Sequence, residues 1–498
     1  MLRPLFLVLL LACARGAVPP GATSDAAVAP EVHADAANPD LAAVEAGAAD
    51  ARADLFVVST PGGLALAATG VVDSVDPAGG EQLKVQLTLA NGSNAPIQLA
   101  RSPMFVLTRG GFCWMNGDPV TTSGTFFGTG TLAPGATSPP IDLGWVGPAP
   151  FTHWLFRLEP GPGSPALLAA VPLLRAGYEP PAPVELGDVF LGLQEPLEVV
   201  PLSTGKNFLT VIWRTVNTTG KPMTFTRWSV KLTDAGGTVL DADLTVPGGV
   251  SNFAPPLATS VYGWNVPDGF TTGMVTVSTD LTLAGGPSLA LTRTVPVQAV
   301  QPSVHRPPVQ GLWLWGTGPG RLGLDQPNLF LPIRRHAYDL TMLEDVDGTR
   351  AALRGDPTKN ESYFAFGQPF FAIDDAVVLD VVDDAPDNFG NTLNPANEPR
   401  RDNHIVLTDG RQRFTVYSYL RQGSAKVKVG QRVSAGDPLG AVGNAGSSKQ
   451  PGLHIYRYEI DEAGRAQAVP LAFTGLNAVP GGPVSGVPLG GLEYIGGP

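Results

Sequence analysis

Glycine and proline interrupt this chain so often that long helices have little room to form. The 498 residues include 60 glycines and 49 prolines, and only 15% carry a charged side chain. Both residue types are unfavourable inside helices and are typical of the turns between strands. A 43% share of hydrophobic residues is enough for real cores. The composition therefore predicts an all-β protein of about three domains, at roughly 150 residues per domain.

The first 14 residues have the pattern of a signal peptide. Arg3 precedes an apolar run over residues 5–11, and Ala12-Cys13-Ala14 is typical of a cleavage site. The run is too short to span a bilayer. A second interpretation stays open, because Leu10-Leu11-Ala12-Cys13 resembles a lipoprotein signal in which Cys13 carries a lipid anchor. Both interpretations predict a secreted or cell-envelope protein, in the periplasm or at the outer membrane, that meets a membrane only through that anchor.

Two further features limit the partners and the arrangement of the chain. The net charge is −12 and no long basic stripe occurs, which argues against a nucleic-acid partner. Residues 15–52 are rich in Ala, Pro, Asp and Glu without apolar periodicity, so we expect a disordered linker there.

Residues 53–180 and 181–300 have the pattern of two repeats. In each unit a strand with alternating faces ends in an Asn-led turn, at Asn91 in the first and at Asn217 in the second. Each unit later carries a strand with a tryptophan, Trp145 or Trp264, at a similar distance. Short strands between Gly/Pro turns predict two immunoglobulin-like β-sandwiches. Both Asn segments match the glycosylation pattern, but turn chemistry explains them better.

A third domain is expected at residues 301–498, where strands carry a series of short motifs. These are Asn403-His404, Tyr417-Ser418-Tyr419-Leu420, Val-Gly-Gln-Arg-Val at 429–433, Gly-Asn-Ala-Gly at 443–446, and Gly452-Leu453-His454. Together they resemble the LytM/lysostaphin-type zinc endopeptidases, which cut peptidoglycan cross-bridges. The resemblance covers about residues 308–462 and implies a LytM-like β-sheet domain with the duplicated hybrid motif.

The resemblance also implies a zinc site. In this family two His and one Asp hold the metal, with one position open to water. The metal lowers the pKa of that water, and two further His help to activate it and to stabilise the oxyanion. His454 matches one ligand and Asp339 matches the ligand Asp. We therefore expect these two side chains within about 5 Å of each other.

The remaining positions depart from the family pattern. Gly452 replaces one helper His and is expected to point where that imidazole belongs. Tyr419 replaces the other, and a phenol with its usual pKa of ~10 is a poor base. His336, the candidate third ligand, precedes Asp339 by three residues instead of four, which puts it on the opposite face unless a bulge intervenes. His404 either lines the groove or packs. Zinc is therefore expected to bind weakly or not at all.

Three functions remain open. The first is a catalytically degenerate domain that binds peptidoglycan or regulates a cell-wall hydrolase. The second is an active zinc metalloendopeptidase that uses Asp339, His454 and an unusual third ligand. The third is a surface scaffold or adhesion protein that binds through its β-sandwich pair.

Overall fold

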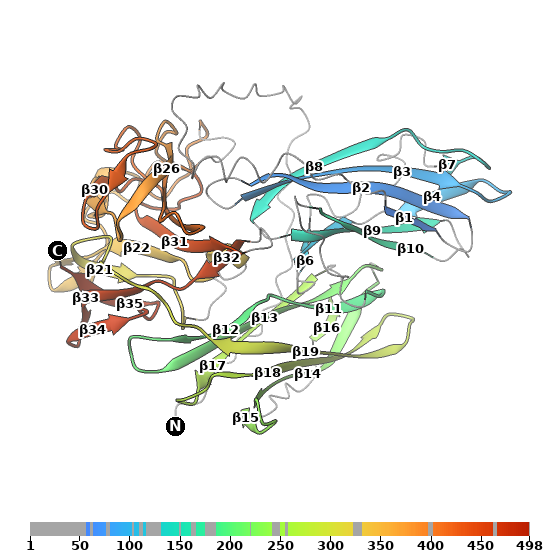
Figure 1. The fold of residues 1–498 in the computed structure, drawn as a ribbon, viewed down its shortest axis with the longest axis horizontal. Helices are drawn as coiled ribbons and strands as arrows, with labels where there is room; N and C mark the ends of the chain where they lie inside the picture. The colour runs from blue at the N-terminus through green and yellow to red at the C-terminus, as the bar shows by residue number, and fades with distance from the viewer. Residues whose placement is uncertain are drawn as a thin grey trace.

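The chain is all-β, with 3-10 turns as its only helical elements among the residues that the computed structural model describes (Figure 1). These are residues 56–59, 63–75, 80–101, 104–108, 113–115, 131–148, 151–160, 166–174, 186–219, 221–241, 250–253, 257–321, 331–396, 402–461 and 466–497. The predicted signal peptide with Cys13 and the predicted linker at 15–52 lie outside them. Over the described ranges, no helix is long and apolar enough to cross a membrane.

The first unit consists of two sheets around one core. One sheet has the order β1-β2-β3-β8, and the other has the order β6-β5-β9-β4-β7 with β10 beside β9. Alternate residues of β2 and β3, such as Leu66 and Leu87, pack against Trp154 and Phe156 of the second sheet. The strands are β1 (Phe56–Ser59), β2 (Leu64–Val75), β3 (Gly80–Asn91), β4 (Ile97–Arg101), β5 (Met104–Thr108), β6 (Cys113–Met115), β7 (Thr131–Leu132), β8 (Ile141–Pro148), β9 (Phe151–Pro160) and β10 (Leu167–Pro172).

The second unit joins its two halves into one sheet of nine strands, of order β11-β13-β12-β19-β18-β14-β15 with β16 beside β14 and β17 beside β13. The parallel pair β12–β19 makes the join. Both halves still contribute to a single core. The strands are β11 (Val189–Leu193), β12 (Leu197–Pro201), β13 (Asn207–Asn217), β14 (Met223–Asp234), β15 (Val239–Asp241), β16 (Val250–Phe253), β17 (Leu257–Val266), β18 (Thr272–Leu283) and β19 (Ser288–Ala299).

Strand pairing relates the two units to each other. The neighbours β2-β3-β8 correspond to β11-β13-β17, and β5-β9-β10 correspond to β14-β18-β19. Trp145 lies opposite Leu83, and Trp264 lies opposite Leu209, at matching points of the paired strands. These pairings support the repeat, while the immunoglobulin-like assignment and the domain boundaries stay predictions.

The same local chemistry ends the corresponding strands of the two units. The Asn91 side chain accepts from the Ser93 backbone N–H at 2.9 Å and donates to the Ala95 carbonyl. The Asn217 side chain accepts from the Thr219 N–H at 3.0 Å and donates to the Lys221 carbonyl. Both asparagines are buried. Turn formation therefore accounts for both Asn-x-Ser/Thr segments.

The third unit is built on a twelve-stranded sheet of order β20-β33-β35-β21-β22-β31-β28-β27-β26-β29, with β32 beside β31 and β34 beside β33. Its elements are β20 (Val304–His305), β21 (Gly311–Trp315), η2 (Pro332–Arg334), β22 (Tyr338–Met342), β23 (Glu344–Val346), β24 (Thr349–Ala351), η3 (Asn360–Ser362), β25 (Pro369–Phe371), β26 (Ala376–Val382), β27 (His404–Thr408), β28 (Arg413–Ser418), β29 (Arg432–Val433), β30 (Pro438–Ala441), β31 (Leu453–Ile460), β32 (Ala466–Val469), β33 (Ala472–Val479), β34 (Pro483–Gly486) and β35 (Leu492–Gly496).

His153 of the first unit makes stability depend on pH. It is 4% exposed, and burial lowers the pKa of its imidazole to about 4. In the unfolded chain this pKa is about 6.5, so between about pH 6.5 and about pH 4 only the unfolded state takes up a proton. The free energy of unfolding therefore falls by up to about 3 kcal/mol as the pH is lowered from about 6.5 to about 4.

We expect His153→Asn to remove this part of the pH dependence, because it removes the imidazole that takes up the proton. The amide also keeps a partner for the Thr152 hydroxyl, whose oxygen lies 3.1 Å from His153 Nδ1. Urea unfolding of both proteins at about pH 7 and about pH 4.5 measures the difference. Equal losses of stability in the two proteins would contradict the assignment.

Candidate functional site

A row of polar side chains crosses the centre of the third unit's sheet. Asp339 of β22 lies opposite His454 of β31, His454 lies opposite Ser418 of β28, and Ser418 lies opposite His404 of β27. Residues directly opposite in antiparallel strands share a face of the sheet. The register alone therefore brings these four residues, far apart in the chain, onto one surface.

Asp339 and His454 form a direct pair at one end of this row. His454 Nδ1 is 2.7 Å from Asp339 Oδ1, with the imidazole almost fully buried and the carboxylate 36% exposed. Thr317 holds the carboxylate from behind, because its hydroxyl lies 3.0 Å from Oδ2 and accepts the Asp339 backbone N–H at 2.8 Å. The expected proximity of Asp339 and His454 is therefore present. His454 Nε2 is buried and has no hydrogen-bond partner within the described residues.

The residues present fit zinc poorly. Ligand distances of 2.0–2.2 Å in a tetrahedral site separate two donor atoms by roughly 3.3 Å. The 2.7 Å contact between Asp339 and His454 is shorter and is already a hydrogen bond. Across the part of the chain that the structure describes, no three His, Cys, Asp or Glu residues come together as a metal site. A metal here would need a shift of the pair and a further donor.

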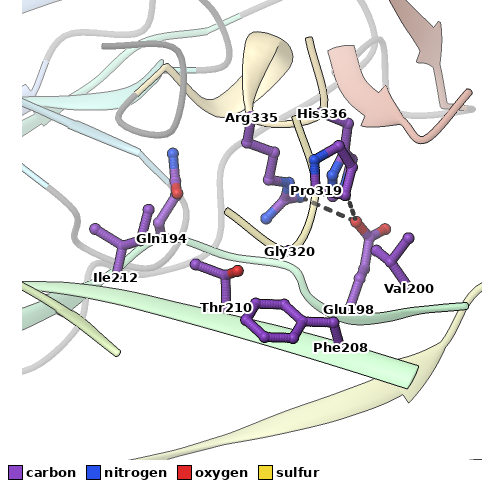
Figure 2. A pocket seen from close by; sticks show the side chains of 10 residues that line it. All are labelled: Gln194, Glu198, Val200, Phe208, Thr210, Ile212, Pro319, Gly320, Arg335 and His336. Atoms are coloured by element: carbon purple, nitrogen blue, oxygen red, sulfur yellow. Dashed lines mark hydrogen bonds and ion pairs between the residues drawn. The ribbon is translucent and has the colours of Figure 1, made fainter. Parts of the chain in front are cut away.

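His336 does not supply that donor. Its Nε2 lies 3.1 Å from Glu198 Oε2 of β12, and Arg335 contacts the same carboxylate at 3.5 Å (Figure 2). Burial lowers the pKa of His336, although Glu198 opposes this. The turn after η2 directs the His336 imidazole toward Glu198 of the second unit, and its role as third ligand stays a prediction.

His404 lies in the row but has other partners. Its Nε2 is 2.9 Å from Asp380 Oδ2, and its Nδ1 is 3.1 Å from the Asp402 carbonyl oxygen. The side chain is 12% exposed. His404 therefore packs within the row, and contact with a bound molecule stays a prediction.

Tyr419 stands beside the Asp339–His454 pair. Its ring centroid lies 5.4 Å from that of His454, and its backbone has a φ of 71°, which few residues other than glycine adopt. Burial raises the pKa of Tyr419 well above its ordinary value, and Asp339 and Asp402 raise it further. The phenol stays neutral, so it offers a hydrogen-bond donor and no base.

The backbone of β22 passes close to Gly452. A Cβ at this position would lie 2.9 Å from the backbone carbonyl oxygen of Leu340 in β22. The cause is strand pairing, since the next residue, Leu453, lies opposite Leu340. The close carbonyl leaves little room for a side chain at this position, and the place of Gly452 at a former helper position stays a prediction. The backbone of β22 closes the space that a side chain would need.

The sequence motifs did not indicate Arg334, a positively charged residue in the same region. Its guanidinium lies over the Tyr456 ring, 5.0 Å from the centroid. Burial tends to lower the pKa of Arg334, but Tyr456, Tyr419 and Asp402 raise it overall, so the group stays charged. No family motif of the sequence singles out this position. A fixed positive charge therefore lies beside Tyr419 where the sequence suggested only histidines and an aspartate.

Comparison with known proteins identifies this part of the chain. Residues 364–468 match the peptidase family M23. Structural likeness extends to the catalytic domain of lysostaphin from Staphylococcus simulans (23% identity over 31% of this chain and 86% of that chain, TM-score 0.18). It also extends to a zinc-containing peptidase from Vibrio cholerae (10% identity, 64% and 77%, TM-score 0.21). No curated protein matches the chain.

The family match, not the structural likeness, supports the assignment, because TM-scores this low say nothing about activity. The matched range holds His404, Tyr419, Gly452 and His454 but begins after Asp339. The third unit thus contains a LytM-type domain, as its motifs predicted, and half of the expected metal pair lies before the matched range.

The closed space at Gly452 predicts a cost for any side chain. We expect Gly452→Ala to lower the free energy of unfolding by about 1–3 kcal/mol, because the Cβ forces β22 and β31 apart. Gly482→Ala is the matched control, since a Cβ there meets nothing within 4 Å. Urea unfolding of both variants tests this, and equal stabilities would contradict the closed space. Gly452→His with Tyr419→His should suffer at least the same loss.

Proposed function

We propose that this chain, whose C-terminal part is a LytM-type peptidase-family domain, is an exported cell-envelope protein that has lost peptidase activity. Its groove binds peptidoglycan, or holds a cell-wall hydrolase that acts on it. The family match supports the link to peptidoglycan. The loss of activity and the export are the proposed part, with the signal pattern of residues 1–14 as the support for export.

The observation that carries the loss of activity is the closed helper position. The Leu340 carbonyl oxygen lies 2.9 Å from the point where a Cβ of residue 452 would stand, so an imidazole there would require the backbone of β22 to shift. The other helper position holds Tyr419, a neutral phenol. General acid–base groups of this kind typically contribute 10²–10⁴-fold in rate each. Without both helpers, and with two donors for a metal, hydrolysis has little to support it.

Charge in the groove supports binding instead. Asp339 keeps an exposed carboxylate edge, and Arg334 supplies a fixed positive charge nearby. Cell-wall peptides carry both amino and carboxyl groups, so a site with both signs of charge suits them. The Thr317 and His454 contacts hold the Asp339 carboxylate in one orientation, which reduces the entropy lost on binding.

The test is to mix purified full-length protein with isolated peptidoglycan. We expect no solubilisation of the wall with or without added zinc, and co-sedimentation of the protein with the wall. We expect Arg334→Gln to weaken co-sedimentation about 10-fold, since a charged hydrogen bond contributes about 1.5–3 kcal/mol. The matched control is Arg432→Gln, which alters an exposed arginine of β29 outside the row.

Two results would refute the proposal in different ways. Cleavage by the unmodified protein that a chelator stops, and that Asp339→Asn abolishes, would show an active zinc peptidase. Absence of wall binding together with capture of a cell-wall hydrolase would leave the regulatory half of the proposal and remove the wall-binding half.

A further inference from the structure

Ser303, His305 and Asp374 form a hydrogen-bonded chain where the second unit joins the third. The Ser303 hydroxyl oxygen lies 2.7 Å from His305 Nε2, and His305 Nδ1 lies 2.5 Å from Asp374 Oδ1. One imidazole thus has a hydroxyl on one nitrogen and a carboxylate on the other. This is the order of groups that activates a serine for attack on an acyl carbon.

Charge fixes the direction of the protons in this chain. Burial raises the pKa of Asp374, but His305 and Arg457 lower it more, so the carboxylate is ionised. Arg457 binds its second oxygen at 2.5 Å. The carboxylate can only accept, so His305 Nδ1 is the donor of this contact. In the neutral imidazole Nε2 is then left with its lone pair, directed at the Ser303 hydroxyl.

The surrounding strands hold the imidazole and leave the serine accessible. His305 belongs to β20, which pairs with β33, and its ring lies edge-on to Phe473 with 6.2 Å between centroids. Its side chain is 3% exposed. Ser303 is only partly buried and lines an open hollow of about 500 Å³. The base is therefore shielded while a small molecule can reach the hydroxyl.

The hollow is separate from the groove of the LytM-type domain. Successive side chains of a strand point to opposite faces. In β31 the rings of His454 and Tyr456 lie together on one face, whereas Arg457 contacts Asp374 and lines the hollow. The two sites thus lie on opposite faces of the sheet, and neither depends on the other's chemistry.

We propose that Ser303 is the nucleophile of a second site, which hydrolyses short-chain esters. The lining is largely polar or charged and provides no long apolar slot for an acyl chain. Arg306 also lines the hollow and is the candidate donor to a developing oxyanion, whereas Arg413 in the same lining is paired with Asp409 and Glu459. The site is independent of the proposed peptidoglycan function.

The reaction balances within these residues and water. The Ser303 oxygen bonds to the acyl carbon as its proton moves to His305 Nε2, and collapse of the intermediate breaks the bond to the leaving alkoxide. That alkoxide takes the proton from Nε2 and departs as an alcohol. Water then attacks the acyl-serine, passing one proton to Nε2, and Ser303 regains its proton as the carboxylic acid leaves.

The test is covalent labelling of the full-length protein with a biotinylated fluorophosphonate, which forms a serine phosphonate ester and releases fluoride. Peptide mass mapping should place the adduct on Ser303, and Ser303→Ala should lose it. Ser434→Ala is the matched control and should label as the wild type does. Ser434 is exposed, and its hydrogen bonds with Asp437 use its backbone N–H and carbonyl.

A substitution of Asp374 distinguishes a catalytic role of the hydrogen-bonded residues from a purely structural one. We expect Asp374→Asn to slow labelling about 10²–10⁴-fold, because an amide no longer holds the proton on Nδ1. If the loss of the Arg457 partner unfolds this variant, His305→Gln removes the base without removing that ion pair and should slow labelling equally. If Ser303 in the wild type is labelled no faster than Ser434, the proposal is overturned. The hydrogen bonds among Ser303, His305 and Asp374 would then have only a structural role.

Discussion

The register between β22 and β31 determines which groups meet at the centre of the LytM-type domain. Pairing Asp339 with His454 brings the two predicted metal donors into contact. The same pairing sets Leu340 opposite Leu453 and brings the Leu340 carbonyl against Gly452. One strand register therefore both forms the carboxylate–imidazole pair and narrows the space at residue 452. Because both strands are central in the sheet, neither can shift without moving the core around them.

The turn before β22 divides its side chains between two environments. Arg334 reaches toward Tyr456 in the groove, while Arg335 and His336 reach Glu198 on the second unit. The Glu198 side chain is only 9% exposed; desolvation raises the pKa of its carboxyl, but Arg335 and His336 lower it more, so it is ionised. A buried carboxylate with two basic partners is costly to break, since removal of one partner leaves a charge without compensation. This contact couples the entry to β22 to the sandwich beside it (Figure 2).

Strand periodicity explains why some of this was predictable from sequence. The all-β class followed from turn residues and alternation, and the Asp339–His454 contact was implied by the resemblance to the LytM/lysostaphin-type family. The corresponding turns at Asn91 and Asn217 were visible because one side chain determines each of them.

The features that the sequence did not indicate have a common physical origin. The direction of His336 depends on a 3-10 turn and on Glu198, 138 residues away. The closed space at Gly452 depends on the separation of two backbones, and Arg334 depends on which way one residue of that turn points. None of these quantities has a local pattern in the sequence. The Ser303–Asp374 connection likewise spans segments that only the folded sheet brings together.

The contact between Gly452 and the Leu340 carbonyl also limits how this domain can be redesigned. A side chain at residue 452 requires a wider spacing between β22 and β31. Because β22 and β31 pair directly, that spacing cannot change at one strand alone. An engineered histidine at this position would therefore need compensating substitutions in both strands.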